Sequence, residues 1–258
     1  MVRVARLVRD SQVWKSVFRH GVPRDKSTRI RAVLGNVFLH LHPPSVRRSG
    51  VEVTYTWCMG GTTFLLFLVE LVTGVLLMFY YRPTAEYAYK DIIALGSHVP
   101  FGLVREIHRW GAHLMVITVW LHMLRVFLTG SYKPPREFNW VVGVVLLVLT
   151  MLLSFTGYLL PWDQLSMWAV TVGTNMAGAA PVVGAQGPGS GLVSVGEVPL
   201  VHSGSDLRSL LLGGSSVGPA ALLRFYVLHC IALPLIAMVL MAVHFWRIRK
   251  DGGISGPL

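Results

Sequence analysis

Four long apolar stretches constrain this chain more than any other feature. A helix needs about 20 apolar residues to cross the hydrocarbon core of a bilayer, and a helix also satisfies its own backbone polar groups there. Of the 258 residues, 53% are hydrophobic and only 14% are charged, which is unusual for a soluble domain. We therefore predict an all-α membrane protein built as a bundle of four transmembrane helices. The stretches are Tyr55–Tyr80, Ile107–Leu128, Trp140–Leu160 and Leu223–Trp246.

The basic residues gather in three places that four spans bring to one side of the membrane. Residues 1–50 hold eleven of the 23 Lys and Arg residues, and two shorter clusters follow the second and fourth stretches. The positive-inside rule makes this side cytoplasmic, with both termini on it. The net charge of +11 is thus explained by topology, and we do not expect nucleic-acid binding. The two clusters are Arg125, Lys133 and Arg136, and Arg247, Arg249 and Lys250.

The remaining segments divide the chain into three parts. Residues 1–54 form a basic segment in which "RIRAVLGNVFLHL" predicts an amphipathic helix at the interface. Residues 55–250 form the helical domain, and residues 251–258 form a tail. The outer connection at 161–221 is rich in Gly and Ser and is expected to be an exposed, irregular loop. It starts with a predicted short helix capped by Asp163.

Histidines are paired in two of the apolar stretches. His108 and His122 are 14 residues apart, so they share one helix face and are separated by a rise of about 21 Å. His229 and His244 are 15 residues apart, and a kink or bulge near Pro234 would absorb the extra residue. A lone membrane histidine commonly forms an interhelical hydrogen bond. Two pairs at matching depths instead predict two bis-histidine haem sites, an outer one (His108 with His229) and an inner one (His122 with His244).

Glycines repeat with the same spacing on the other two stretches. Gly60 and Gly74 are 14 residues apart, and so are Gly143 and Gly157. Glycine allows close approach to a flat macrocycle, so we expect these four residues to pack against the haems. Ordinary packing of small residues between membrane helices is the alternative.

Charged residues flank the histidines. Arg105 precedes His108 by three residues and Arg125 follows His122 by three, where haem propionates would reach the interface. Interfacial snorkelling of these two arginines is the alternative. Glu70 lies one turn from Gly74 within the hydrocarbon. We expect it to hold its proton and to form a hydrogen bond near the outer haem or a quinol pocket, or a structural bond to a neighbouring helix.

Several motifs together resemble the N-terminal half of cytochrome b from quinol-oxidising cytochrome bc complexes, in its b6-type branch. The resemblance covers residues 36–184 and 205–258, and the order and spacing of the motifs agree as well. A spacing of 15 residues in the fourth stretch and a chain of four helices also favour this branch. The motifs are "WCMGG", "VTGVLLMFYYRPT", "HRWGAHLMV", "LHMLRVFLTGSYKPPRE", "TGYLLPWDQLSMWAV", "RFYVLH" and "IRKDGGISGPL".

The resemblance implies a function. Quinol is oxidised at the outer side, where one electron passes to a Rieske iron–sulfur protein. The other electron crosses through two b haems to an inner quinone, which generates a proton-motive force. It further implies that Cys58 forms a single thioether to a third haem, a haem c beside the inner b haem. Arg109, Arg249 and Lys250 join the residues expected near propionates or quinone.

The resemblance also implies partners: a subunit-IV-like C-terminal half of cytochrome b, the Rieske protein and a c-type cytochrome, in a dimeric complex. Three features depart from the family pattern. They are the long basic N-terminus, an insertion near residues 185–204, and Glu70 in place of a glutamine. The first two favour a bacterial cytoplasmic membrane over a thylakoid membrane. We expect the insertion to lie on the outer surface, away from the haems.

Two other functions fit four apolar helices. One is the b-type haem subunit of a hydrogenase-like or formate dehydrogenase-like quinone reductase, although the "PWDQ" motif argues against it. The other is a membrane scaffold without redox chemistry.

Overall fold

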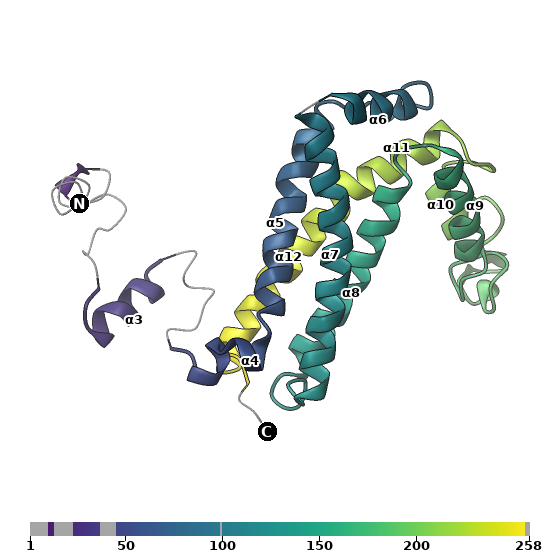
Figure 1. Ribbon diagram of the computed structural model, residues 1–258. Coiled ribbons are helices and arrows are strands. Elements are labelled where there is room, and N and C mark those ends of the chain that lie inside the picture. The colour runs from purple at the N-terminus through teal and green to yellow at the C-terminus, as the bar shows by residue number, and fades with distance from the viewer. Residues whose placement is uncertain (1–9, 13–22, 37–44, 99, 256–258) are drawn as a thin grey trace. The chain divides into compact units, whose positions relative to one another are not determined.

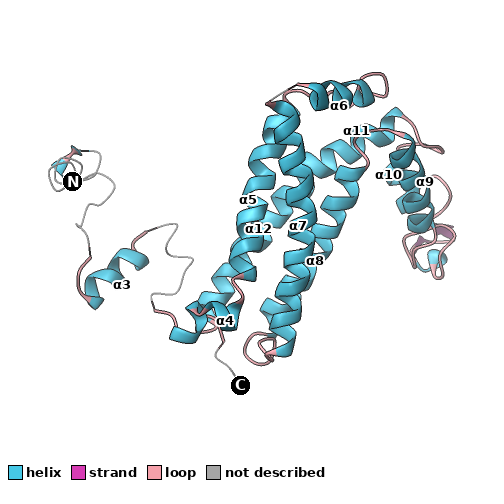
Figure 2. Cartoon of the chain, viewed as in Figure 1, coloured by secondary structure: helices cyan, strands magenta, loops and turns pink. Residues whose placement is uncertain are grey.

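The computed structural model describes residues 10–12, 23–36, 45–98 and 100–255, and this part of the chain is mostly helical (Figures 1 and 2). The four predicted spans are confirmed as helices long and apolar enough to cross a membrane: Met59–Met78, Gly102–Leu128, Glu137–Tyr158 and Pro219–Lys250. The elements are α3 (Lys26–Leu34), η2 (Arg48–Val51), α4 (Val53–Thr56), α5 (Met59–Met78), α6 (Ala88–Ser97), α7 (Phe101–Leu128), α8 (Glu137–Tyr158), α9 (Gln164–Gly178), η3 (Ser190–Leu192), β1 (Ser194–Val195), β2 (Val198–Pro199), α10 (Leu207–Leu212), α11 (Pro219–Val227), η4 (Leu228–Ala232) and α12 (Leu233–Lys250).

The first span begins later than the sequence predicted. A short helix, α4, ends at Thr56, and Trp57 and Cys58 then both adopt left-handed backbone conformations with φ of 52°. Two consecutive left-handed residues break the helix, because such residues cannot continue a right-handed one. The span therefore starts at Met59, with Cys58 as its N-cap residue.

The fourth span contains a bulge, as the spacing of its two histidines predicted. Its helix changes from α to π over Leu228–Ala232 and returns to α at Leu233. A π-turn holds one residue more than an α-turn, so it takes up the extra residue between His229 and His244. It lies directly upstream of Pro234, whose missing N–H suits a break in the ladder of i→i−4 hydrogen bonds.

The chain consists of two compact units. The larger comprises residues 58–125 and 143–240, and the smaller comprises residues 1–57, 126–142 and 241–258.

The larger unit has a core where α8, α9, α10 and α11 meet. The fully buried residues Leu159, Val170, Leu212 and Phe225 form its centre. Figure 1 shows α9 and α10 side by side at one end of this unit, and α10 contacts both α9 and α11. The connection that contains α9 and α10 is thus tied firmly to the outer ends of the spans.

This connection is more ordered than the expected irregular loop. Asp163 caps α9 as predicted, because its carboxylate accepts a hydrogen bond from the Ser166 N–H at 2.8 Å. Helix α10 was not predicted. Asp206 caps it in the same way and also accepts the N–H of Ala185, so the glycine-rich stretch is fastened to the cap. Hydrogen bonds, chiefly from Ser209, hold the pKa of Asp206 below its usual range. The predicted insertion contains η3 and the β1–β2 hairpin.

In the smaller unit, polar side chains cluster around the end of α12. Tyr55 and Ser131 both hydrogen-bond to Ser255, and Arg247 pairs with Asp251 at 2.8 Å. Helix α3 covers the first part of the predicted interfacial helix, and Asp25 caps it. The rest of that predicted helix, from residue 37, lies outside the described residues.

A buried aspartate anchors the connection between α5 and α7 through an ion pair with Arg82. Asp91, in α6, is buried and accepts two guanidinium hydrogen bonds from Arg82 at 2.6 and 3.0 Å, together with the Arg82 backbone N–H. The Arg82 guanidinium also lies 3.8 Å from the centre of the Tyr87 ring. The Arg82 side chain holds the pKa of Asp91 below its usual range.

This ion pair predicts a pH-dependent anchor. A lowered pKa means that the charged form of Asp91 stabilises the fold above the ordinary pKa of aspartate, and that this contribution is lost as the pH falls through the folded value. Asp91→Asn should weaken the anchor by about 1–3 kcal/mol, because charge-assisted hydrogen bonds are lost. Faster amide hydrogen exchange across α6 at pH 7 would reveal the change. The difference between variant and wild type should shrink as the pH is lowered, and an unchanged exchange rate at pH 7 would contradict the prediction.

Candidate haem site

The structure brings together the two histidines that the sequence paired at the outer level. His108 lies on α7, and His229 lies in the π-helical segment η4. Their ring centres are 6.1 Å apart and the ring planes are nearly perpendicular, at 85°. Both residues belong to the larger unit. Two imidazoles from different spans therefore lie next to each other inside the larger unit.

The outward nitrogen of each ring is held by the protein. The Nδ1 of His108 lies 2.9 Å from the Thr73 hydroxyl and 3.1 Å from Oε2 of Glu70. The Nδ1 of His229 lies 3.1 Å from the Leu153 carbonyl oxygen and 3.3 Å from the Thr156 hydroxyl. Acceptors at Nδ1 place the ring proton there and leave Nε2 free for a metal.

Glycines make room for these rings. A Cβ atom at Gly157 would lie 2.5 Å from Cε1 of His229, closer than packed atoms can approach. A Cβ at Gly74 would lie 3.2 Å from Cε1 of His108. Gly74 and Gly157 thus lie directly against the histidine rings, and the packing of the four glycines against haem stays a prediction.

These residues fit a haem iron. A metal–imidazole nitrogen bond is about 2 Å and the ring centre lies about 1 Å further out, so two imidazoles on one metal have centres about 6 Å apart. The observed 6.1 Å agrees with this value. Because both Nδ1 atoms have acceptors, both rings have the tautomer that ligation needs.

At the inner level, the larger unit supplies half of the predicted site. A Cβ at Gly60 would lie 3.2 Å from Cε1 of His122, so α5 approaches this ring as it does the outer one. Cys58 is two residues before Gly60 and is exposed. His244 belongs to the smaller unit, and its pairing with His122 stays a prediction.

The chain is similar to known proteins along most of its length. The family described as "Cytochrome b/b6/petB" matches residues 46–187, and "Cytochrome b(N-terminal)/b6/petB" matches residues 189–257. Cytochrome b6 from Porphyra purpurea is 42% identical over 89% of this chain and 94% of its own length. Cytochrome b6 from Acaryochloris marina has the same identity and coverage. The chain belongs to the cytochrome b/b6 family.

A solved structure shares the fold. It is titled "Hyperthermophilic respiratory Complex III", and it matches with a TM-score of 0.68 and 25% identity over 96% of this chain. The present chain spans 55% of the matching chain.

Membership of the cytochrome b/b6 family settles the general assignment. The chain is a multi-pass membrane subunit of a quinol-oxidising cytochrome bc or b6f complex, where it transfers electrons, and the family implies b haems. The hydrogenase-like alternative and the scaffold are therefore set aside.

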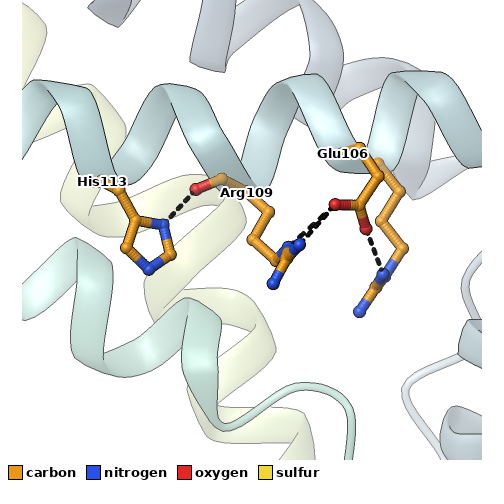
Figure 3. Close-up of polar contacts among 4 residues, drawn as sticks. Glu106, Arg109 and His113 are labelled. Carbon is orange, nitrogen blue, oxygen red and sulfur yellow. Dashed lines mark hydrogen bonds and ion pairs between the residues drawn. The ribbon is translucent and has the colours of Figure 1, made fainter.

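The arginines predicted near the outer propionates form an ion-pair chain along α7. Glu106 accepts from Arg105 at 2.9 Å through one carboxylate oxygen and from Arg109 at 2.6 Å through the other (Figure 3). The Arg109 carbonyl oxygen forms a hydrogen bond with Nδ1 of His113, so the His113 ring is held by a residue of its own helix. A propionate at Arg105 would compete with Glu106 for the guanidinium.

The other predicted site residues lie at several positions. Arg125 is buried at the end of α7, and Lys250 is exposed with its ammonium group 4.9 Å from the Trp246 ring. Arg249 is in the last turn of α12, and Gly143 lies in α8. Asp163 acts as a helix cap, and a proton-handling role for it stays a prediction.

Sequence reasoning missed the two threonines that hold the outer rings. Thr73 and Thr156 directly precede the outer glycines, so the dipeptide Thr-Gly occurs at corresponding places on α5 and α8. The inner glycines follow Met59 and Val142 instead. This difference between the outer and inner levels is visible in the sequence and could have identified the two threonines.

The glycine contacts predict the outcome of small substitutions. Gly157→Ala should release the outer haem, because the added methyl group collides with the His229 ring and overpacking of this kind costs about 1–3 kcal/mol. Gly61→Ala is the matched control, since nothing lies within 4 Å of its added methyl group. Measuring the amount of b haem bound per subunit distinguishes the Gly157→Ala variant from the Gly61→Ala control. Full haem content in the Gly157 variant would refute the assigned contact.

Proposed function

We propose that this chain carries electrons from an outer quinol-oxidation site to an inner quinone site through two b haems. His108 and His229 hold the outer haem, and His122 and His244 hold the inner one. The neighbouring rings of His108 and His229, with their centres 6.1 Å apart and both Nδ1 atoms hydrogen-bonded, carry this proposal. When bound, the haems supply reversible one-electron chemistry within the low-dielectric interior.

The chain's own residues contribute position and environment. The histidines fix each macrocycle at a set depth, and Thr73, Thr156 and the Leu153 carbonyl fix the orientation of the outer rings. The apolar spans exclude water, so electrostatic contacts near the haems act strongly. Arg105, Arg109, Arg125, Arg249 and Lys250 supply the cations for propionates or quinone.

Ligand substitution tests the two levels separately. His229→Leu should remove the outer haem and keep the inner one, and His122→Leu should do the reverse, because each replacement deletes one axial bond. His113→Leu is the control, since its ring nitrogen is bonded to its own helix. Reduced-minus-oxidised spectra of the purified complex report the result. Two haem signals in either ligand variant would contradict the assignment.

We further propose that Cys58 forms a thioether to a haem c at the inner side. Three observations support the site. Cys58 is exposed, it is the N-cap residue of α5 with a left-handed backbone conformation, and it is two residues from the glycine that lies against His122. The match of "CMGG" to the family motif gives the chemistry.

A denaturing gel stained for haem peroxidase activity tests the thioether. The wild-type subunit should keep its stain, because a covalent haem survives denaturation while b haems wash out. Cys58→Ala should lose the stain, and Cys230→Ala should keep it. A colourless wild-type band, or a stained Cys58→Ala band, would exclude the attachment.

The proposed partners are a subunit-IV-like half of cytochrome b, a Rieske iron–sulfur protein and a c-type cytochrome or a plastocyanin-like acceptor, in a dimeric complex. The proposed location is a bacterial cytoplasmic membrane with both termini inside. The clustering of Lys and Arg in the segments between and beyond the spans supports this orientation.

A further inference from the structure

The carboxyl group of Glu70 lies close to Nδ1 of His108, the proposed ligand of the outer haem. Its Oε2 is 3.1 Å from Nδ1 of His108, and only 14% of its side chain is exposed. Glu70 and Thr73 are on α5, one turn apart, and both approach the same ring nitrogen. The Thr73 hydroxyl donates to the Val69 carbonyl at 2.7 Å, so towards His108 it acts as an acceptor.

Helix α7 is shaped to admit this carboxyl group. A Cβ atom at Gly111 would collide with Oε1 of Glu70 and lie 3.3 Å from its Cδ. Gly111 is three residues beyond His108, on the neighbouring turn of the same helix. A glycine at this position therefore leaves the space that lets Glu70 reach Nδ1.

The two axial ligands of the outer haem are held differently. The Nδ1 of His229 has a backbone carbonyl and a hydroxyl as partners, whereas the Nδ1 of His108 has a hydroxyl and a carboxyl group. A hydrogen-bond acceptor at Nδ1 increases the basicity of a ligating imidazole, and at His108 the carboxyl group adds a second side-chain acceptor beside the Thr73 hydroxyl. A more basic imidazole donates more electron density and favours ferric over ferrous iron.

We propose that Glu70 is a positioning residue that accepts the Nδ1 hydrogen bond of His108 and thereby lowers the midpoint potential of the outer haem, and that Gly111 makes room for it. This inference rests on the proposed function, because it presupposes the outer haem. Acceptance requires only a lone pair on Oε2, so it holds whether or not the carboxyl group carries a proton.

Redox titration of the haems in the purified complex tests the proposal. Glu70→Leu should raise the midpoint potential of the outer haem and leave that of the inner haem unchanged. Glu70→Gln, which keeps a carbonyl oxygen in place, should give a value closer to wild type. Glu86→Gln is the matched control for loss of a carboxylate, because Glu86 is exposed and contacts Lys90 outside the spans. It should change neither potential.

A double-mutant cycle tests the part played by Gly111. Gly111→Ala should raise the outer potential by displacing the carboxyl group, and combining it with Glu70→Leu should add nothing further. Electron paramagnetic resonance of the outer haem reports the angle between the ligand planes. An unchanged spectrum in Glu70→Leu shows that the ring has stayed in place, so that the potential shift comes from the lost hydrogen bond.

The possible failures are distinguishable. Absence of two b haems in the wild-type complex would overturn the proposed function itself. With both haems present, an unchanged outer potential in Glu70→Leu would overturn this inference alone, as would a Glu70→Gln value equal to that of Glu70→Leu. Additive effects of the Gly111 and Glu70 substitutions would show that the glycine does not act through the carboxyl group.

Discussion

An imidazole ring inside a hydrocarbon slab has two nitrogens to satisfy, and the outer part of this bundle is arranged around that requirement. In water the ring would exchange partners freely, but in the membrane interior each nitrogen needs a fixed one. For His108 and His229, the Nδ1 atoms take acceptors from α5 and α8, and the two ring centres lie 6.1 Å apart. The packing of α5 against α7 and of α8 against η4 therefore depends on the nitrogens of these two rings.

Close approach is the structural means of meeting this requirement. Threonine and glycine occur together at the outer level because their tasks are coupled. The glycine lets the neighbouring helix lie against the ring, and the threonine next to it then reaches Nδ1. A larger residue in place of the glycine would hold the helices apart and remove the acceptor as well. Stability and ligand orientation thus depend on the same short contact.

Much of this arrangement could be predicted from the sequence, because a bilayer simplifies the rules. Apolar length predicted four spans, which the structure confirms, and the placing of the histidines predicted the approach of His108 to His229. The orientation inferred from charge clustering and the inner haem level stay predictions. The break at Trp57 and Cys58 was missed, since left-handed backbone at non-glycine residues has no reliable local signal. Helix α10 was missed because it has only six residues, and because its packing against α9 and the hydrogen bond from the Ala185 N–H to Asp206 join segments that are distant in the sequence. The contact between Glu70 and His108 joins two helices, and its geometry depends on their rotation as well as on sequence spacing.

The π-helical segment divides the fourth span into two parts whose side chains are rotated differently about the helix axis. Upstream of Leu228 the helix face is set by the bundle around His229, and downstream of Ala232 every side chain is turned by one residue, about 100°, relative to an uninterrupted helix. A deletion of a single residue in this stretch would preserve the length and apolarity of the span, yet it would turn the half bearing His244 towards a different neighbour. The bulge therefore sets a fixed rotation between the part of the helix that bears His229 and the part that bears His244, so that neither part dictates the rotation of the other.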